Sequence, residues 1–219
     1  MNILIVHAHN EPKSFSSALK DLSLNHFLTK GHEVIVKDLF EMEFNPVPQR
    51  SDFKTVLHPD YFHYMKEQVY AFQNNGFSDE LTQEMNDLEW ADLLIINAPL
   101  WWSSSPAILK GWFDKVLAMG FAYHPRDKKF ETGVFKNKKA FCCFTAGGSE
   151  AAYSEGGENG DIDMVLYHIN HGTLYYCGFE VLPSFLTWRT HLSDEATLKG
   201  YLDQYQQFLD NLDNAQKLY

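Results

Sequence analysis

Residues 91–119 read ADLLIINAPLWWSSSPAILKGWFDKVLAM, and this stretch decides how the rest of the chain is interpreted. It opens with ADLLIIN, a short apolar run typical of a strand buried on both faces of a parallel sheet. After a loop with two tryptophans and three serines, AILKGWFDKVLAM spaces its apolar residues three and four apart, as an amphipathic helix does. Open parallel sheets bind ligands outside the carboxyl ends of their strands. The loop is therefore a candidate site for a planar molecule that carries phosphate.

Strands and helices are expected to alternate along the whole sequence. Buried apolar runs predict strands at Asn2–Ala8, Glu33–Asp38, 91–97, Ala140–Thr145 and Glu180–Leu182. Periodic segments predict helices between Ser14 and Gly31, at 107–119, at Asp161–Tyr176 and at 194–213, with Ser14 and Ser193 as N-caps. This order predicts an α/β fold: a flavodoxin-like, doubly wound, five-stranded parallel sheet with helices on both faces.

Residues 59–90 are expected to form a helical insertion within a single domain of residues 1–219. The segments Tyr61–Gln73 and Ser78–Leu88 have helical patterns and lengthen the connection between the second and third strands. Because a crossover of this length is unusual, we expect the insertion to cover a site or to contact a partner chain.

The composition restricts the classes of partner. The chain of 219 residues is 45% hydrophobic and 15% aromatic, which fits one domain with a substantial core. Its formal net charge of −11 argues against nucleic acid and anionic membrane surfaces, since both attract basic proteins. No apolar run reaches membrane-spanning length, so no membrane insertion is expected. A bound phosphate is compatible with this charge, because backbone amides hold phosphate without a basic patch.

The three cysteines, Cys142, Cys143 and Cys177, do not make an even disulfide framework. Free thiols in the core of a protein from a reducing compartment are favoured over redox chemistry. The first residues, MNILIVHAHNEP, lack the basic region and the cleavage site of a signal peptide. We therefore expect a cytoplasmic protein.

No familiar phosphate-binding motif is present. The sequence has no G-x-G-x-x-G after its first strand and no G-x-x-x-x-G-K-[ST]. The first strand is instead followed by HAHNEPKSFSS, whose hydroxyls and helix N-terminal amides suit a pyrophosphate. We expect a site assembled from the loops that follow three strands, at residues 9–17, 99–106 and 145–160.

At these loops the chain resembles the NAD(P)H:quinone oxidoreductase family of FAD-containing two-electron reductases. The motifs that carry the resemblance are AHNEPKSF (8–15), PLWWSSSPAILKGWFDKV (99–116) and TAGGSEAAYS (145–154). DLFEMEFNP and HGTLYYCGFEVL also match, so the resemblance covers roughly residues 2–185. It implies a homodimer with FAD at the subunit interface. It also implies a ping-pong cycle in which NAD(P)H gives a hydride to flavin N5, leaves, and is replaced by a quinone.

The resemblance assigns cofactor contacts to all three loops. The diphosphate and adenosine side would be held by His9, Ser14, Phe15 and Ser16. The isoalloxazine edge would be lined by Pro99, Leu100, Trp101, Trp102, Ser103, Thr145, Ala146, Gly147 and Gly148. The substrate pocket would contain Phe121, Ala122, Tyr123 and Tyr176, although core packing competes for these side chains and Tyr176 would serve the partner subunit. We predict no metal, because Tyr175 stands where one branch of the family has its second histidine ligand.

Two residues are implied to serve catalysis. Reduction places negative charge near flavin N1 and O2, where the family uses a tyrosine and a histidine that follow the Gly-Gly turn. Tyr153 matches the tyrosine, whereas Asn159 stands at the histidine position. An asparagine donates a hydrogen bond but does not exchange a proton near neutral pH. One branch of the family also lacks this histidine and prefers small dihydronicotinamide donors to NAD(P)H.

Two alternative functions share this fold. An FMN-dependent azo- or nitroreductase would not need a pyrophosphate-binding site at HNEPKSF, because FMN lacks the adenosine diphosphate extension. The fold also resembles ancillary regulatory subunits of glutathione-gated potassium efflux systems, which the insertion at 59–90 disfavours. Trp101 and Trp102 are adjacent in a loop and do not both face one core, so at least one is expected to contact a ligand or a partner.

Overall fold

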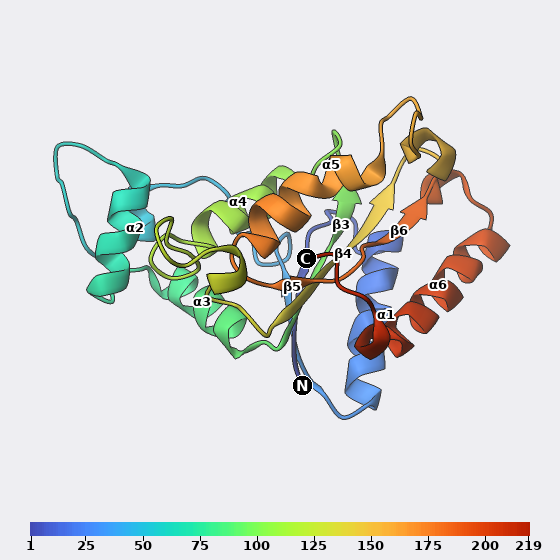
Figure 1. Cartoon of the computed structure of the whole chain (residues 1–219), viewed down its shortest axis with the longest axis horizontal. Coiled ribbons are helices and arrows are strands. Elements are labelled where there is room, and N and C mark those ends of the chain that lie inside the picture. The colour runs from blue at the N-terminus through green and yellow to red at the C-terminus, as the bar shows by residue number, and fades with distance from the viewer.

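The computed structural model describes all 219 residues and contains a parallel sheet with the strand order β2-β1-β3-β4-β5 (Figure 1). This 2-1-3-4-5 order is that of flavodoxin-like doubly wound sheets, so the predicted fold class is confirmed. The strands are β1 (Asn2–His7), β2 (Glu33–Asp38), β3 (Leu93–Leu100), β4 (Lys139–Ala146), β5 (Glu180–Val181) and β6 (Phe185–Trp188).

Helices cover both faces of the sheet, as Figure 1 shows. They are α1 (Phe15–Thr29), α2 (Tyr64–Gln73), α3 (Asp79–Trp90), α4 (Ala107–Val116), α5 (Ile162–Ile169) and α6 (Glu195–Asp210). Alternate strand residues point to opposite faces, so Ile3 and Ile5 pack with α1 and α6, whereas Leu4 and Val6 pack with α3, α4 and α5. Burial on both faces explains why the central strands are continuously apolar. None of the helices is long and apolar enough to cross a bilayer.

Strand β6 was not predicted. β5 pairs with the first two residues of β4, Lys139 and Ala140, whereas β6 pairs with residues 143–146 at the end of β4. The two short strands both run parallel to β4, so they are parts of one strand position that is interrupted at residues 182–184. Pro183 lies in this interruption and has no amide hydrogen to donate to a neighbouring strand.

The two helices of the predicted insertion have different roles. α3 packs on the sheet through Leu81, Met85 and Leu88, so it is the crossover helix between β2 and β3. α2 lies at the periphery, to the left in Figure 1, with Met65 and Phe72 exposed. The inserted part is therefore α2 with its flanking loops.

The helix ends follow the sequence signals, with one correction. Ser14 caps α1 with its hydroxyl, and Gly31 follows the helix with a positive φ of 78°, both as predicted. The predicted cap Ser193 is wrong, because the carboxylate of Asp194 accepts the hydrogen bond from the Thr197 amide at 2.8 Å. An aspartate also suits the positive end of the helix dipole.

The predicted helix Asp161–Tyr176 changes its geometry halfway. α5 ends at Ile169, and a π-helical turn, Asn170–Tyr175, continues it. The buried Asn170 side chain accepts a hydrogen bond from Cys142 of β4 at 3.5 Å. π-Helical turns are rare and often occur beside functional sites.

Candidate functional site

The carboxyl ends of β1, β3, β4 and β6 meet at one edge of the sheet, which we call the carboxyl edge. From β1 the chain passes to α1 on one face of the sheet, whereas from β3 it passes to α4 on the other face. A switch point of this kind is where open α/β sheets bind ligands. The three predicted loops therefore leave from one edge, and a fourth loop, after β6, joins them.

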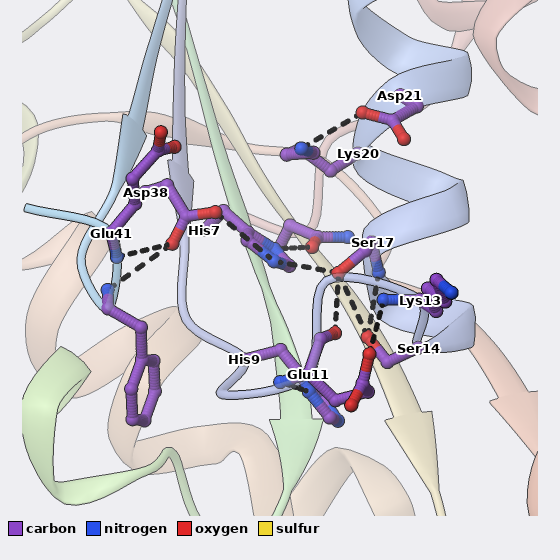
Figure 2. Close-up of polar contacts among 12 residues, drawn as sticks. His7, His9, Glu11, Lys13, Ser14, Ser17, Lys20, Asp21, Asp38 and Glu41 are labelled. Atoms are coloured by element: carbon purple, nitrogen blue, oxygen red, sulfur yellow. Dashed lines mark hydrogen bonds and ion pairs between the residues drawn. The ribbon is translucent and has the colours of Figure 1, made fainter.

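His9 lies in the loop after β1 and is oriented by the backbone (Figure 2). Its Nδ1 accepts a hydrogen bond from the Glu11 amide at 2.9 Å, so a neutral ring carries its hydrogen on Nε2. Burial lowers the pKa of His9, which keeps the imidazole neutral at pH 7. Nε2–H is therefore a fixed donor near the N-terminus of α1, where the amides of the first turn favour an anion.

The predicted serine contacts hold α1 against the sheet. Ser14 Oγ accepts from the Ser17 amide at 3.1 Å. Ser16 Oγ lies 2.9 Å from Thr145 Oγ1 at the end of β4, and both residues are buried, as is Ala146. These hydroxyls are engaged within the chain, so their part in the site is to position the helix N-terminus.

Trp101 to Ser104 form a tight turn at the centre of the carboxyl edge. Each of these two residues donates its amide to the carbonyl of the other, at 2.9 and 3.0 Å. Trp102 and Ser103 have φ values of 53° and 54°. Type I′ turns require such positive values at both central residues, which are usually asparagine and glycine. The left-handed conformation costs about 1–2 kcal/mol for each such residue. The Trp102 side chain is fully exposed, so the core-packing alternative fails for it.

His168 of α5 supports this turn, and the sequence analysis missed it. Its Nδ1 lies 2.9 Å from the Val165 carbonyl, which only accepts, so Nδ1 carries the hydrogen. Nε2 therefore accepts from the Ser104 hydroxyl, also at 2.9 Å. No sequence signal marks such a contact, because the two residues are 64 positions apart.

Pro99 and Leu100 belong to β3 rather than to the loop in which we expected them. The Asn97 carbonyl accepts from the Ala8 amide, so Pro99, two residues further on, faces the same side, beyond the end of β1. Its missing amide hydrogen therefore costs no ladder hydrogen bond. Both side chains are buried.

Gly148 brings the two predicted catalytic residues together. A Cβ atom at Gly148 would lie 2.8 Å from Cε2 of Tyr153 and 2.9 Å from Nδ2 of Asn159, so a larger residue here would displace one of these side chains. At Gly147 the nearest atom to such a Cβ is a ring carbon of His191 at 4.0 Å, which leaves the space open. The structure thus places Tyr153 and Asn159 at one point of the carboxyl edge, beside an uncovered stretch of backbone.

The end of β6, at Trp188, is a candidate part of the site that the sequence did not predict. Trp188 stacks on Tyr153 with ring centroids 5.5 Å apart. Tyr201 of α6 donates to the Trp188 carbonyl at 3.3 Å and lies edge-on to Phe15 at 6.3 Å. The available signal was the short aromatic and branched run FLTW (185–188), which has high β propensity. Through Tyr201, the end of β6 therefore connects Tyr153 with the start of α1.

The predicted substrate-pocket tyrosines lie in another part of the chain. Tyr123 and Tyr176 meet edge to face with centroids 5.4 Å apart and line a cavity of ≈ 490 Å³. Its other lining residues are Pro48, Tyr64, Met65, Gln68, Lys110, Phe113, Asp114, Leu117, Gly172, Thr173 and Cys177, none of them from the loops of the carboxyl edge. Ala122 is buried, and Phe121 packs against Phe135 instead.

The three cysteines are free and buried, as predicted. Burial raises the pKa of Cys143 and of Cys177 to about 12, and it also raises the pKa of Cys142. Because the thiolate is the reactive form, these side chains are inert at neutral pH.

The residues at the carboxyl edge fit a flavin nucleotide. The open space above Gly147 leaves room for a flat ring at the backbone, where a Cβ would meet no atom closer than 4.0 Å. The exposed Trp102 indole offers an aromatic surface to the same edge. The α1 N-terminus and the His9 Nε2–H group would suit the phosphates.

The fold and this edge place the chain in the class of flavodoxin-like α/β proteins. A family model described as a flavodoxin-like fold matches residues 1–209. The sequence is 36% identical over 211 residues to the ribosyldihydronicotinamide dehydrogenase [quinone] of Pongo abelii, covering 96% of this chain and 91% of that protein. It is 39% identical over 217 residues to the NAD(P)H dehydrogenase [quinone] 1 of Cavia porcellus, covering 99% and 78%.

A solved structure from Klebsiella pneumoniae, assigned as a quinone reductase, is similar to the whole chain. It superposes with a TM-score of 0.95 at 36% sequence identity and covers 100% of this chain and 87% of that one. The chain belongs to the NAD(P)H:quinone oxidoreductase family.

Proposed function

We propose that this protein is a flavin-dependent NAD(P)H:quinone oxidoreductase, which transfers two electrons from a reduced nicotinamide to a quinone. The observation that supports this most is the junction at Gly148, where Tyr153 and Asn159 meet beside the open backbone of Gly147. The same chain is 39% identical to an NAD(P)H dehydrogenase [quinone] 1 over 99% of its length.

The cofactor that we propose is FAD. The carboxyl edge continues past the Gly-Gly turn to the α1 N-terminus. There Phe15 and Tyr201 meet edge to face, with ring centroids 6.3 Å apart. FMN ends at its single phosphate and would leave this aromatic pair unused. The extent of the edge therefore favours the longer cofactor, with the adenosine near α1 and α6.

The chain's own residues would orient and stabilise the reaction. When bound, the flavin supplies the redox chemistry, taking a hydride from the nicotinamide and passing two electrons to the quinone. Tyr153 would donate a hydrogen bond to the negative charge that develops on reduction, and stacking on Trp188 fixes its ring. Asn159 would donate a second hydrogen bond through Nδ2 but would hold no transferable proton.

We propose that the active form is a homodimer of chains that each form one domain, residues 1–219, with α2 inserted. Tyr123 and Tyr176 line a cavity that shares no residue with the carboxyl edge of the same chain, and in the proposed homodimer they would serve the flavin of the second copy. Exposed apolar side chains at Trp102, Met65 and Phe72 are available for such an interface. Because the cysteines are unpaired thiols, a cytoplasmic location is also proposed.

Cofactor identity and donor use test the proposal. The protein is purified, its cofactor is extracted and weighed, and menadione reduction is measured with NADH, NADPH and a truncated dihydronicotinamide. FAD with two-electron reduction of menadione is expected. FMN alone, combined with azo or nitro reduction faster than quinone reduction, would establish the alternative reductase. A stable stoichiometric complex with a membrane transporter would favour a regulatory subunit instead.

A further inference from the structure

A buried polar cluster lies beside the loop that carries His9 (Figure 2). His7 ends β1 and has no exposed surface. Its Nδ1 lies 2.5 Å from Oδ1 of Asn97 on β3, and its Nε2 lies 3.2 Å from Oγ of Ser17 on α1. We call His7, Asn97 and Ser17 the His7 cluster. One imidazole thus joins β1, β3 and α1.

The position of the His7 cluster in the sheet points to the ligand site. His7 and Asn97 are register partners across β1 and β3, the two strands at the switch point. The preceding buried residues of β1, Ile3 to Val6, are all aliphatic, so the polar group appears only where the strand reaches the carboxyl edge. Switch points of doubly wound sheets are where their ligands bind.

The hydrogen bonds of the cluster fix the state of the imidazole. Asn97 Oδ1 only accepts, so His7 Nδ1 carries the ring hydrogen, and a neutral Nε2 then needs a donor. The Ser17 hydroxyl is that donor. The same hydroxyl lies 3.1 Å from the Glu11 carbonyl and 2.9 Å from Ser14 Oγ. Its single hydrogen therefore has three possible acceptors, which are His7 Nε2, the Glu11 carbonyl and Ser14 Oγ.

We propose that His7 is the positioning residue of the cofactor-phosphate loop, residues 8–14: the neutral imidazole takes the Ser17 hydrogen, so Ser17 Oγ accepts from the Ser14 hydroxyl while the Glu11 carbonyl keeps the Ser14 amide as its donor. When His7 gains a proton, Nε2 becomes a donor, and the Ser17 hydrogen turns to Glu11. The loop then loses the arrangement that suits the phosphates. This inference rests on the proposed function, because it assigns the loop to a flavin nucleotide.

Burial favours the neutral form of His7 at pH 7, while the groups around it act in both directions. Burial lowers the pKa of His7 most strongly, and Lys20 of α1 and His9 of the loop act in the same direction. Asp38 at the end of β2 opposes them, with Oδ2 4.0 Å from Nε2, although its other oxygen already accepts from two backbone amides. Lys20 is itself paired with Asp21 at 2.9 Å. Asn97, which faces His7 from β3, carries no charge, but its hydrogen bond to Nδ1 acts against burial and raises the pKa of His7.

Ser23 offers a matched control, which distinguishes a positioning role of the His7 cluster from a role in core packing alone. Ser23 is also on α1, is as buried as Ser17, and bonds a buried side chain, with its Oγ 2.7 Å from the Tyr205 hydroxyl. It lies two helical turns from the loop. Ser17→Ala and Ser23→Ala therefore remove comparable hydrogen bonds, only one of which touches the loop.

The test measures FAD affinity and loop protection in the full chain. FAD is titrated into flavin-free protein, and amide hydrogen exchange is followed at residues 9–14, in wild type and in His7→Leu, His7→Gln, Ser17→Ala and Ser23→Ala. We expect His7→Leu and Ser17→Ala to weaken FAD binding about five- to tenfold, the effect of one net hydrogen bond, and to speed exchange in the loop. Ser23→Ala is expected to leave both unchanged. Wild-type affinity is expected to fall as the pH is lowered through the folded-state pKa of His7, which lies below the ordinary value of 6.5, and His7→Gln is expected to remove that dependence.

The outcomes are distinguishable. If His7→Leu and Ser17→Ala lower thermal stability but leave FAD affinity and loop exchange as in wild type, His7 is only a core residue and the inference fails. If His7→Gln keeps the wild-type pH profile, the titration belongs to His9 and the proton-dependent part fails. If wild type binds no flavin, the proposed function fails, while loop exchange in the same variants still decides whether His7 positions residues 8–14.

Discussion

The ring of Tyr153 stacks on the indole of Trp188, with centroids 5.5 Å apart and planes inclined by 27°. Trp188 ends β6, which adds to β4 in register, with Ala146 opposite Trp188. A strand that follows Tyr153 by more than thirty residues therefore sets the orientation of the proposed catalytic ring. Stacking fixes the ring and leaves its hydroxyl for a ligand.

Tyr153→Phe separates the hydroxyl from the stacking. The phenyl ring keeps its contact with Trp188, so the melting temperature should stay within about 1–2 °C of wild type. Loss of the hydrogen-bond donor should slow flavin reduction on the order of 100-fold, as for other donors aimed at developing charge. Stopped-flow reduction by NADH measures this. The control is Tyr167→Phe on α5, an exposed tyrosine stacked on His171; equal rates in the two variants would remove Tyr153 from the catalytic residues.

Asn159→His places a titratable group beside Tyr153. The Asn159 amide nitrogen lies 2.9 Å from the position that a Cβ at Gly148 would take, and an imidazole at position 159 would offer a proton near neutral pH. We expect several-fold faster menadione reduction with NADH and NADPH, together with a new pH dependence near pH 6–7. Steady-state rates from pH 5 to 9 give both quantities. Unchanged turnover and an unchanged profile would show that position 159 does not govern the choice of donor.

Gly148→Ala should reduce activity by displacing both proposed catalytic side chains. The added methyl group would lie within 2.9 Å of Tyr153 and Asn159, so one of them must move. We expect at least a tenfold loss in kcat/KM. Gly200→Ala is the control, because a Cβ there meets no atom within 4 Å and α6 should gain about 1 kcal/mol in free energy of unfolding. Similar activity in the two variants would contradict the proposed crowding at Gly148.

The sequence predicted the central sheet because its strands are buried on both faces. β1, β3 and β4 are then continuous apolar runs, and Ser14 with Gly31 marks the ends of α1 through local hydrogen bonding and a positive φ. These are local properties, visible within a few residues. The sequence also predicted that the three loops converge, because parallel strands bring their carboxyl ends to one edge of the sheet.

The features that escaped prediction depend on contacts between distant residues. Four residues of β6 are a strand because β4 offers its free edge at residues 143–146, and no periodicity within FLTW reveals this. The turn at Trp102 and Ser103 adopts left-handed φ values without asparagine or glycine, so its turn type is not encoded in the usual residues. The contact of His168 with Ser104 likewise depends on the tertiary fold.

Buried histidines should make stability depend on pH below neutrality. Burial lowers the folded-state pKa of His7 and of His26 below the ordinary value of 6.5. Their contribution to stability is therefore complete above pH 6.5 and is lost as pH falls from there through the folded-state values. Urea midpoints measured from pH 7.5 to 4.5 should fall, and less steeply in His26→Gln. His58→Gln, at an exposed position, should keep the wild-type slope; an equal slope in all three proteins would refute the assignment to His26.

Two ion pairs on α4 should differ widely in their effect on stability. Lys115 is buried, and its Nζ contacts Asp52 Oδ1 at 2.9 Å and the Asn45 carbonyl at 2.8 Å, which ties α4 to the connection after β2. Lys115→Met would leave the Asp52 carboxylate buried without its partner, at a cost of about 3–5 kcal/mol in free energy of unfolding.

Lys110→Met is the matched control for this last prediction. It breaks the exposed pair with Asp114 on the same helix, 2.6 Å apart, which should cost no more than about 0.5 kcal/mol. Urea unfolding of the two variants at pH 7 and at low and high salt measures the difference. The Lys115 effect should persist in high salt, because screening acts weakly on buried charges. Equal losses in the two variants would mean that water reaches Asp52 and that the pair does not join α4 to residues 45–52.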